Sequence, residues 1–284
     1  MNKIIIQGLW IGDKLSPFEY ASIKSWLNNG FEYHLYIYDC LANIPNGTTI
    51  KDANEILPRD TIKLYRECYS IFADVFRYKL LLDKGGIWAD CDLYCIRNFN
   101  IDKQYCFLTE KTIKEGAFKS NKPLNVLNSF IYVSQPQTEF MREMYNKALK
   151  YYSRLELKKQ TCNNVGLDAY KWLGGGKLLK KLIDKYKLTD YIVDYKFGFP
   201  VPWWCFKNVF NNNNQFNIGR GWNLEVNLDI ILEDEEIKFI NIHKGWIKNK
   251  GINKDEPLKE CFFKKLLSRI TLESGFTIPN ATLE

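Results

Sequence analysis

Histidine is scarce in this sequence, and its cysteines are not arranged in metal-binding pairs. Only two histidines occur, His34 and His243, and the eight cysteines include no Cys-x-x-Cys motif. A zinc centre with several histidine ligands is therefore excluded, and no cysteine spacing predicts a cysteine-only zinc site. Without a recognisable secretion signal, we expect the cysteines to be free, buried thiols.

Long apolar runs are absent as well. No stretch approaches the ~18–20 residues that a helix needs to cross a bilayer, and the apolar stretch near the N-terminus is too short for a signal peptide. We therefore expect a cytoplasmic protein without a transmembrane segment. The apolar and basic segment Lys259–Ile270 leaves peripheral membrane contact open, although a helix packed against the domain is the favoured interpretation.

Positive charge is concentrated in one region. The net charge is +7, and residues 141–190 hold ten Lys and two Arg against five acidic residues, so this region contains the whole excess. It suits an anionic partner or a membrane surface, whereas a solvated lysine-rich helix face is its commonest explanation. No motif of RNA- or DNA-binding proteins occurs, so we expect no nucleic-acid partner.

The N-terminal pattern is typical of a parallel α/β protein. Lys3–Leu9 is expected to be a buried strand, and Ser16-Pro17-Phe18-Glu19 forms a capping box that begins a helix ending at Asn28. Glu32–Tyr38 alternates as a second strand. With 284 residues, ordinary globular composition and no linker, the chain is expected to form one domain over residues 1–284.

Hydrophobic periodicity and turn residues predict the remaining elements. The polar segment Asn43–Asp60 is expected to be a loop with a short helix, followed by a helix over Thr61–Lys84. Further strands are expected at Ile87–Ala89, Tyr105–Leu108, Val126–Val133, Tyr191–Tyr195 and Ile237–Ile242, and further helices at Glu139–Tyr152, Gly176–Tyr186 and Leu258–Leu267. The sequence thus predicts an α/β fold with a mostly parallel central sheet flanked by helices.

Asp90 and Asp92 directly follow one of these strands. Two residues apart in an extended segment, their carboxylates are expected to point to one side, opposite Cys91. They could hold Mg²⁺ or Mn²⁺ through oxygen at the carboxyl end of a strand, where ligands bind in open α/β sheets. Because this composition produces about one Asp-x-Asp by chance, a turn with two solvated aspartates is the alternative.

A charged pair precedes the two aspartates. Asp74 and Arg77 are neighbours on one face of a predicted helix, and such a pair is most often a surface ion pair. This helix is otherwise apolar, however, and it leads through Gly85-Gly86-Ile87-Trp88-Ala89 into Asp90-Cys91-Asp92.

The segment from Asp74 to Asp92 resembles sugar transferases of the DxD type. These form glycosyltransferase family 32, which includes capsular polysaccharide transferases and initiating mannosyltransferases and is related to the glucosyltransferase domain of large clostridial toxins. Four other stretches are similar to the family: Ile6–Gly12, Leu127–Phe130, Ser134–Pro136 and Ile242–Trp246.

The resemblance implies a GT-A fold and a hexosyltransferase that retains anomeric configuration. It implies a nucleotide-sugar donor, with UDP-hexose favoured over GDP-mannose, a glycan or glycolipid acceptor, and Mn²⁺ or Mg²⁺ as cofactor. Donor binding would involve about residues 1–135, and about 136–284 would form the acceptor side and a closing element. A toxin-like enzyme that glycosylates proteins and a non-catalytic nucleotide-sugar or carbohydrate-binding module are the alternatives.

Donor-binding roles are carried over by position. Trp10 would lie against the nucleotide base, Asp74 and Arg77 would hydrogen-bond the donor sugar, Trp88 would pack beside the sugar or ribose, and Asn128 would belong to the sugar pocket. Core aromatics are the alternative for both tryptophans. Trp88 also departs from the family, in which tyrosine is commoner at this position.

The resemblance also implies roles in metal binding and catalysis. Asp90 would contact ribose or sugar hydroxyls and share the metal, Asp92 would ligate it directly, and His243 would bind the metal or the diphosphate, unless it is an ordinary strand-end histidine. Asp90, Asp92 and Asn128 are the candidate catalytic residues, and the sequence identifies no nucleophile. Gly174–Lys177 stands where the family has Thr-Gly-Pro, which puts acceptor binding in doubt.

Overall fold

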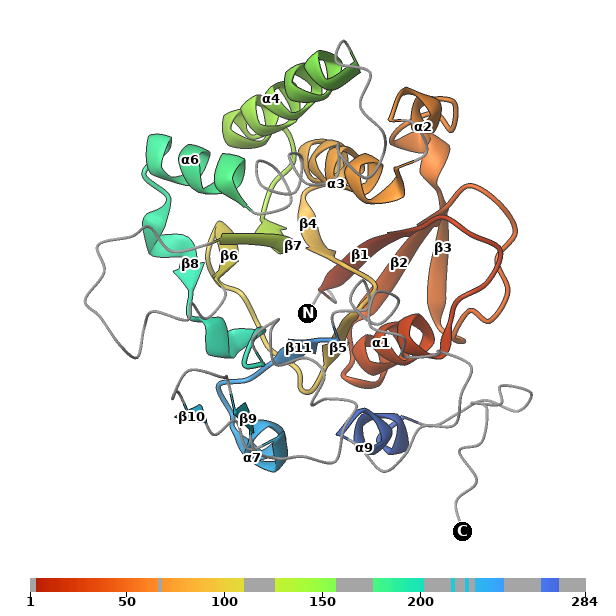
Figure 1. Ribbon diagram of the computed structural model, residues 1–284, viewed down its shortest axis with the longest axis vertical. Helices are drawn as coiled ribbons and strands as arrows, with labels where there is room; N and C mark the ends of the chain where they lie inside the picture. The colour runs from red at the N-terminus through yellow and green to blue at the C-terminus, as the bar shows by residue number, and fades with distance from the viewer. Residues whose placement is uncertain are drawn as a thin grey trace.

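The protein is described by a computed structural model, which covers residues 4–65, 68–109, 126–156, 176–201, 216–217, 223–224, 228–242 and 262–270. A central sheet lies between the helices α3, α4 and α6 on one side and α1, α7 and α9 on the other (Figure 1). The helices are α1 (Pro17–Asn28), α2 (Thr61–Leu64), α3 (Tyr69–Lys84), α4 (Glu139–Glu156), α6 (Lys177–Lys185), α7 (Leu228–Glu233) and α9 (Phe262–Ser268).

The main sheet has seven strands in the order β3-β2-β1-β4-β7-β6-β8. These are β1 (Ile5–Trp10), β2 (Glu32–Ile37), β3 (Thr48–Asp52), β4 (Gly86–Ala89), β6 (Tyr105–Thr109), β7 (Val126–Val133) and β8 (Ile192–Val193). Only β7 runs antiparallel to its neighbours, so the other six strands share one direction. The predicted fold class, a mostly parallel sheet flanked by helices, is confirmed.

Two small antiparallel pairs accompany this sheet. β5 (Leu93–Cys95) pairs with β11 (Phe239–Asn241), and β9 (Phe216–Asn217) pairs with β10 (Asn223–Leu224). The β5–β11 pair joins segments that are more than a hundred residues apart in the sequence. It therefore ties the C-terminal part of the chain to the segment that directly follows β4.

Local sequence signals explain where α1 begins and ends. The Ser16 amide donates to the Glu19 carboxylate at 2.8 Å, which satisfies one of the donors that the start of a helix leaves open. Pro17 occupies the first helical position. Gly30 has φ +85°, so it ends this segment in the left-handed region that favours glycine. The predicted helix is confirmed.

Three predicted elements differ from the structure. The supposed loop Asn43–Asp60 contains the strand β3, followed by a short 3₁₀ helix at Ala53–Glu55. The single helix expected over Thr61–Lys84 is instead the two helices α2 and α3. The expected strand Tyr191–Tyr195 is reduced to the two residues of β8, which lie between two further 3₁₀ turns, Thr189–Tyr191 and Tyr195–Phe197. Propensity alone did not identify β3, because a polar edge strand has little hydrophobic alternation.

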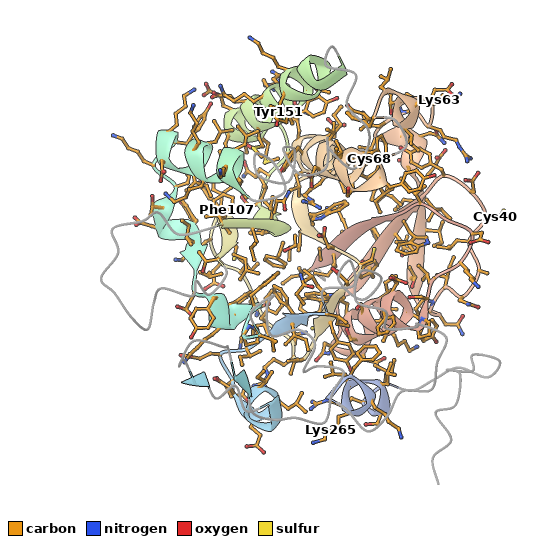
Figure 2. The ribbon with its side chains drawn as sticks, viewed as in Figure 1. Cys40, Lys63, Cys68, Phe107, Tyr151 and Lys265 are labelled. Atoms are coloured by element: carbon orange, nitrogen blue, oxygen red, sulfur yellow. The ribbon has the colours of Figure 1, made fainter. Side chains whose placement is uncertain are left out.

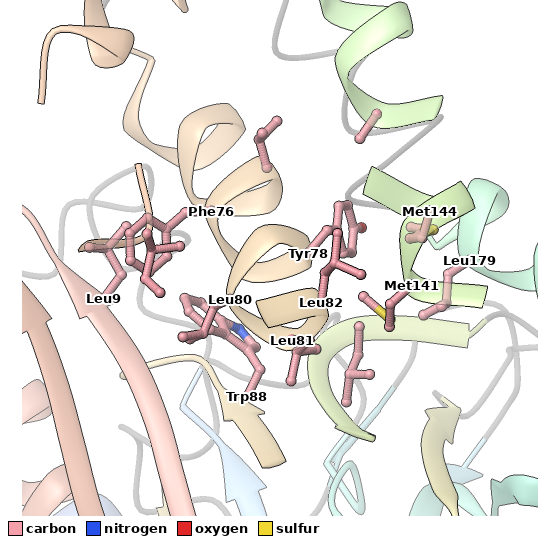
Figure 3. Packing of buried hydrophobic residues seen from close by; sticks show 14 of the residues in the cluster. Leu9, Phe76, Tyr78, Leu80, Leu81, Leu82, Trp88, Met141, Met144 and Leu179 are labelled. Carbon is pink, nitrogen blue, oxygen red and sulfur yellow. The ribbon is translucent and has the colours of Figure 1, made fainter. Parts of the chain in front are cut away.

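Hydrophobic side chains fill both faces of the sheet. On one face, α3 packs against the sheet and α4, and Figure 3 shows Trp88, Leu80 and Leu81 beneath α3 with Met141 and Met144 beside it. On the other face, the ring of Trp26 lies 5.5 Å from that of Phe239. Figure 2 shows Phe107 in the interior, and Cys40, Lys63 and Lys265 at the periphery.

The C-terminal helix α9 is packed on the domain. Phe263 and Leu266 are fully buried, and the Phe263 ring stacks on Phe18 of α1 with centroids 4.6 Å apart. Tyr94 donates its hydroxyl hydrogen to the Leu266 carbonyl at 2.7 Å. The apolar face of α9 is therefore covered by protein. Within the described residues, no helix is both long and apolar enough to span a membrane.

The described cysteines are free thiols. Cys68, Cys95 and Cys106 are buried, Cys91 is half-buried, and Cys40 is exposed in the loop after β2. Burial raises the pKa of the Cys95 thiol well above its ordinary value and that of Cys106 to about 12. The prediction of free thiols is confirmed for these five, and that of burial is wrong for Cys40.

Candidate functional site

Gly85 and Gly86 form a tight corner between α3 and β4. Gly85 and Gly86 have φ values of +65° and +83°, which side chains with a Cβ rarely adopt. The buried Gln7 donates its amide hydrogen to the Gly85 carbonyl at 2.7 Å and so fixes this corner to β1. Because of the sharp turn, β4 runs directly beneath α3, and the residue after β4, Asp90, meets the polar side chains of that helix.

Arg77 bridges two carboxylates at the end of β4. Its Nη1 donates to Asp74 Oδ1 at 3.0 Å, and its Nη2 donates to Asp90 Oδ1 at 2.7 Å. The side chains of Arg77 and Asp74 are only 4% and 12% exposed, whereas that of Asp90 is 31% exposed. The surface-ion-pair interpretation of Asp74 and Arg77 is therefore wrong, and Asp90 is the member of the network that solvent reaches most.

Trp88 belongs both to the core and to this network. It is 2% exposed and packs near Phe76, with ring centroids 6.3 Å apart. Its indole Nε1 donates to Asp90 Oδ1 at 2.7 Å, and the Arg77 guanidinium lies 4.9 Å from its ring centroid, within cation–π range. One Asp90 oxygen is thus held by two donors and its orientation is fixed.

Asn128, on β7, completes the network from the neighbouring strand. Its Nδ2 donates to Asp74 Oδ1 at 2.9 Å and to the Tyr78 hydroxyl at 3.2 Å. These two contacts use both Nδ2 hydrogens and set the orientation of the amide. Tyr78 was not identified from the sequence, although its spacing of four from Asp74 places both on one helix face.

Burial dominates the electrostatics of the two carboxylates. It raises the pKa of Asp74 to about 6, although Arg77 acts in the opposite direction, and it also raises the pKa of Asp90 against the same guanidinium. Among the described residues, the two carboxylates share one arginine. Perturbed carboxylates at a strand end are typical of functional sites, and these can accept hydrogen bonds from ligand hydroxyls.

Asp92 lies in a turn and not in an extended segment. The Leu93 amide donates to the Asp90 carbonyl at 3.0 Å, so Cys91 and Asp92 are the central residues of a turn between β4 and β5. The expectation of an extended Asp90–Asp92 segment is therefore wrong. The Asp90 amide donates to the carbonyl of Ser129 on β7 at 2.9 Å, and this hydrogen bond ties the turn to β7.

The structure describes Trp10 but not His243. Trp10 ends β1 at the same edge of the sheet, but it packs with the opposite hydrophobic cluster, and its indole donates to the Lys14 carbonyl at 3.1 Å. His243 lies outside the described residues, as do Gly174 and Trp246. Its neighbour Ile242 is described, and its amide donates to the Asp92 carbonyl at 2.9 Å.

The available donors suit a hard divalent cation that a substrate helps to hold. Among the described residues, no group of three His, Cys, Asp or Glu side chains could enclose a metal ion. Asp90 and Asp92 supply two carboxylates, both half-buried. Mg²⁺ is commonly bound by one or two carboxylates, phosphate oxygens and water, so this donor set fits such an ion.

Residues 58–160 match the family model described as capsular polysaccharide synthesis protein. The matched stretch contains the whole network from Asp74 to Asn128. It supports glycosyltransferase activity, the enzyme class expected from the sequence. No curated protein matches the chain.

Solved structures show more distant similarity. The PaToxG glycosyltransferase is 15% identical with a TM-score of 0.45, over 65% of this chain and 69% of that protein. The UDP-bound glycosyltransferase domain of the YGT toxin is 8% identical with a TM-score of 0.44, over 68% of this chain and 79% of that domain. At these values, neither structure assigns a role to any residue here.

Proposed function

We propose that this protein is a retaining, metal-dependent glycosyltransferase that moves a hexose from a nucleotide sugar to a hydroxyl of a glycan or glycolipid. A UDP-sugar is the favoured donor. The observation that carries the proposal is the buried bridge from Asp74 through Arg77 to Asp90, located at the carboxyl end of β4 and within the stretch that matches the capsular polysaccharide synthesis model.

In this proposal the network binds the donor sugar. Sugar hydroxyls donate hydrogen bonds to the Asp74 and Asp90 carboxylates, while Arg77 keeps both carboxylates in place with its planar fork. Asn128 extends the polar wall from β7. Trp88 orients Asp90 from below through its indole. Because these side chains are already held in position, binding costs them little conformational entropy.

The metal would be held at the turn after β4. Asp92 and Asp90 supply carboxylate oxygens, and His243 follows Ile242, whose amide is bonded to the Asp92 carbonyl. When bound, a divalent ion offsets negative charge on the leaving diphosphate. Trp10, at the end of β1, is proposed to lie against the nucleotide base.

The proposed transfer breaks the bond between the anomeric carbon and the diphosphate oxygen, and the acceptor oxygen bonds to that carbon on the same face. The proton of the acceptor hydroxyl passes to the departing phosphate oxygen. Asp90 contributes by holding the sugar in the orientation that exposes this bond. No side chain of this network has to form a covalent intermediate.

A donor panel tests the proposal. Purified protein is incubated with Mn²⁺ or Mg²⁺ and a series of UDP- and GDP-sugars, and release of nucleoside diphosphate is measured with and without oligosaccharide acceptors. We expect release from one donor class, dependent on the metal and abolished by Asp92→Ala. Lack of release from every donor would contradict an enzyme. Tight donor binding without release would support the binding-module alternative.

A matched substitution separates loss of the site from loss of the fold. Asp102 is a described aspartate, in the segment between β5 and β6 and outside the site network. Asp102→Ala removes the same charge as Asp92→Ala and should leave release unchanged. Circular dichroism of both variants should match the parent. Retained release in a folded Asp92→Ala protein would remove Asp92 from the proposed metal site.

A further inference from the structure

A cavity with several polar residues in its lining lies away from the network described above. Its volume is about 230 Å³, and its lining comes from β1, β2, β3 and the end of α3. Gly86 lines it, and Gly86 precedes Asp90 by four residues along β4, roughly 13 Å in a strand. The cavity contains none of the residues assigned to the donor site.

Strand register explains why polar groups converge there. Gln7 on β1 is paired with His34 on β2, and Tyr36 on β2 is paired with Lys51 on β3, so side chains from three neighbouring strands meet on one face. Gly86 keeps the floor open, because a Cβ at this position would come within 2.8 Å of Gln7 Nε2.

The charged groups of the lining favour an anion. Lys51 and Lys84 reach the cavity from different elements, and within the described part of the chain neither forms an ion pair closer than 4.0 Å. Glu55 is the carboxylate of the lining, whereas His34 is bonded to Glu32 through Nε2 at 2.6 Å. Two lysines therefore face one lining carboxylate.

We propose that this cavity binds a small polar molecule that carries one phosphate or carboxylate group. The volume equals roughly eight water molecules at ~30 Å³ each, which suits a ligand of monosaccharide size. Lys51 and Lys84 bind the anionic group. Gln7, Tyr36 and Glu55 supply hydrogen-bonding partners for hydroxyls of the ligand.

The two histidines provide a direct readout of the site. Imidazole NMR resonances are assigned with His34→Gln, and glucose 6-phosphate, glucuronate and neutral glucose are titrated separately. We expect a saturable shift of the His34 resonance with at least one of the two acids and none with glucose. Which acid binds more tightly distinguishes phosphate from carboxylate recognition.

Substitutions locate the binding. Lys51→Gln combined with Lys84→Gln should weaken binding about tenfold or more, since hydrogen bonds to an ionised group are the strong ones. Lys177→Gln, an exposed lysine on α6, is the control and should change nothing. Asp92→Ala should also leave binding intact, whatever becomes of the proposed transferase activity.

Four results would overturn the proposal, and the first three concern His34, glucose and Lys177. They are the absence of a saturable His34 shift with either acid, equal binding of neutral glucose, and equal weakening by Lys177→Gln. A shift confined to His243 would place the ligand elsewhere and would equally contradict it.

Discussion

Two carboxylate clusters of this protein have several donors each but opposite electrostatics. Glu143 on α4 accepts hydrogen bonds from Lys185 and Tyr186 at 2.5 and 2.7 Å and pairs with Lys147, and these donors lower its pKa to about 2. Asp74 accepts from Arg77 and Asn128, yet its pKa is raised to about 6. The number of hydrogen bonds therefore does not set the direction of the shift.

Charge balance and depth explain the difference. Glu143 has two lysines for one carboxylate where α4 and α6 meet, and its side chain is 21% exposed, so the carboxylate is stabilised. Asp74 and Asp90 share one arginine, and for Asp74, whose side chain is 12% exposed, the cost of burial exceeds the attraction of that arginine. The first cluster connects two helices. The second keeps an electrostatic cost, as functional sites often do.

Arg77 should give the largest effect. Arg77→Ala leaves two carboxylates without their cation, and removal of one partner from a buried pair costs about 3–5 kcal/mol. We expect that loss in urea unfolding and a loss of nucleotide-sugar turnover of about 100-fold or more. Arg77→Lys keeps the charge without the planar fork and should fold better yet remain impaired. Full turnover by Arg77→Lys would show that the fork is not needed.

Asp74 should make stability depend on pH between about 4 and 6. Its pKa is raised in the folded state, so the folded protein holds a proton that the unfolded chain has already lost, and stability falls as pH rises through this interval. The change amounts to at most about 3 kcal/mol. Asp74→Asn should flatten it in urea titrations at pH 4, 5 and 6. An unaltered slope would locate the titration elsewhere.

Tyr78 should have a smaller effect. Tyr78→Phe removes the hydroxyl that accepts from Asn128, so one Nδ2 hydrogen loses its partner, at a cost of about 1–2 kcal/mol. If Asn128 lines the sugar pocket, KM for the donor should rise more than kcat falls. Tyr145→Phe serves as control, since Tyr145 lies on α4 away from the network. Equal kinetics in both variants would limit Tyr78 to packing.

Glu143 should have the smallest effect, with the opposite pH sign. Its pKa is lowered on folding, so its contribution is present above about pH 4.3 and is lost as pH falls toward about 2. Glu143→Gln should cost about 1 kcal/mol or less at neutral pH and leave turnover unchanged. A decrease in turnover would connect the α4–α6 contact to the proposed active site and contradict a purely structural role for Glu143.

The sequence predicted those parts of the fold that local signals encode. The capping box placed α1, hydrophobic patterns placed β1 and β7, and the glycine pair placed the end of α3. The strand β5 is three residues long and is stabilised by β11, about 145 residues later, so no local signal could reveal it. Because β5 pairs with β11 in this way, the chain has to turn at Cys91 and Asp92, between β4 and β5.

The residues of the network were named from the sequence, but the contacts between them were not. Asp74, Arg77, Trp88, Asp90 and Asn128 were all named from the resemblance, and the structure joins them by hydrogen bonds. Their burial and the shared Asp90 oxygen depend on how α3 packs over β4 and β7, which a sequence does not specify. The roles assigned to these five residues stay predictions, as do those of Asp92, Trp10 and His243.

The structure of a complex would show directly whether the Asp74–Arg77–Asp90 bridge holds the donor sugar. The protein would be crystallised with Mn²⁺ and the UDP-sugar that binds best, and the position of the hexose determined. We expect sugar hydroxyls within hydrogen-bonding distance of Asp74 and Asp90, with the metal on Asp92 and the diphosphate. A nucleotide sugar bound elsewhere, with the Asp74–Arg77–Asp90 bridge untouched by ligand, would contradict it.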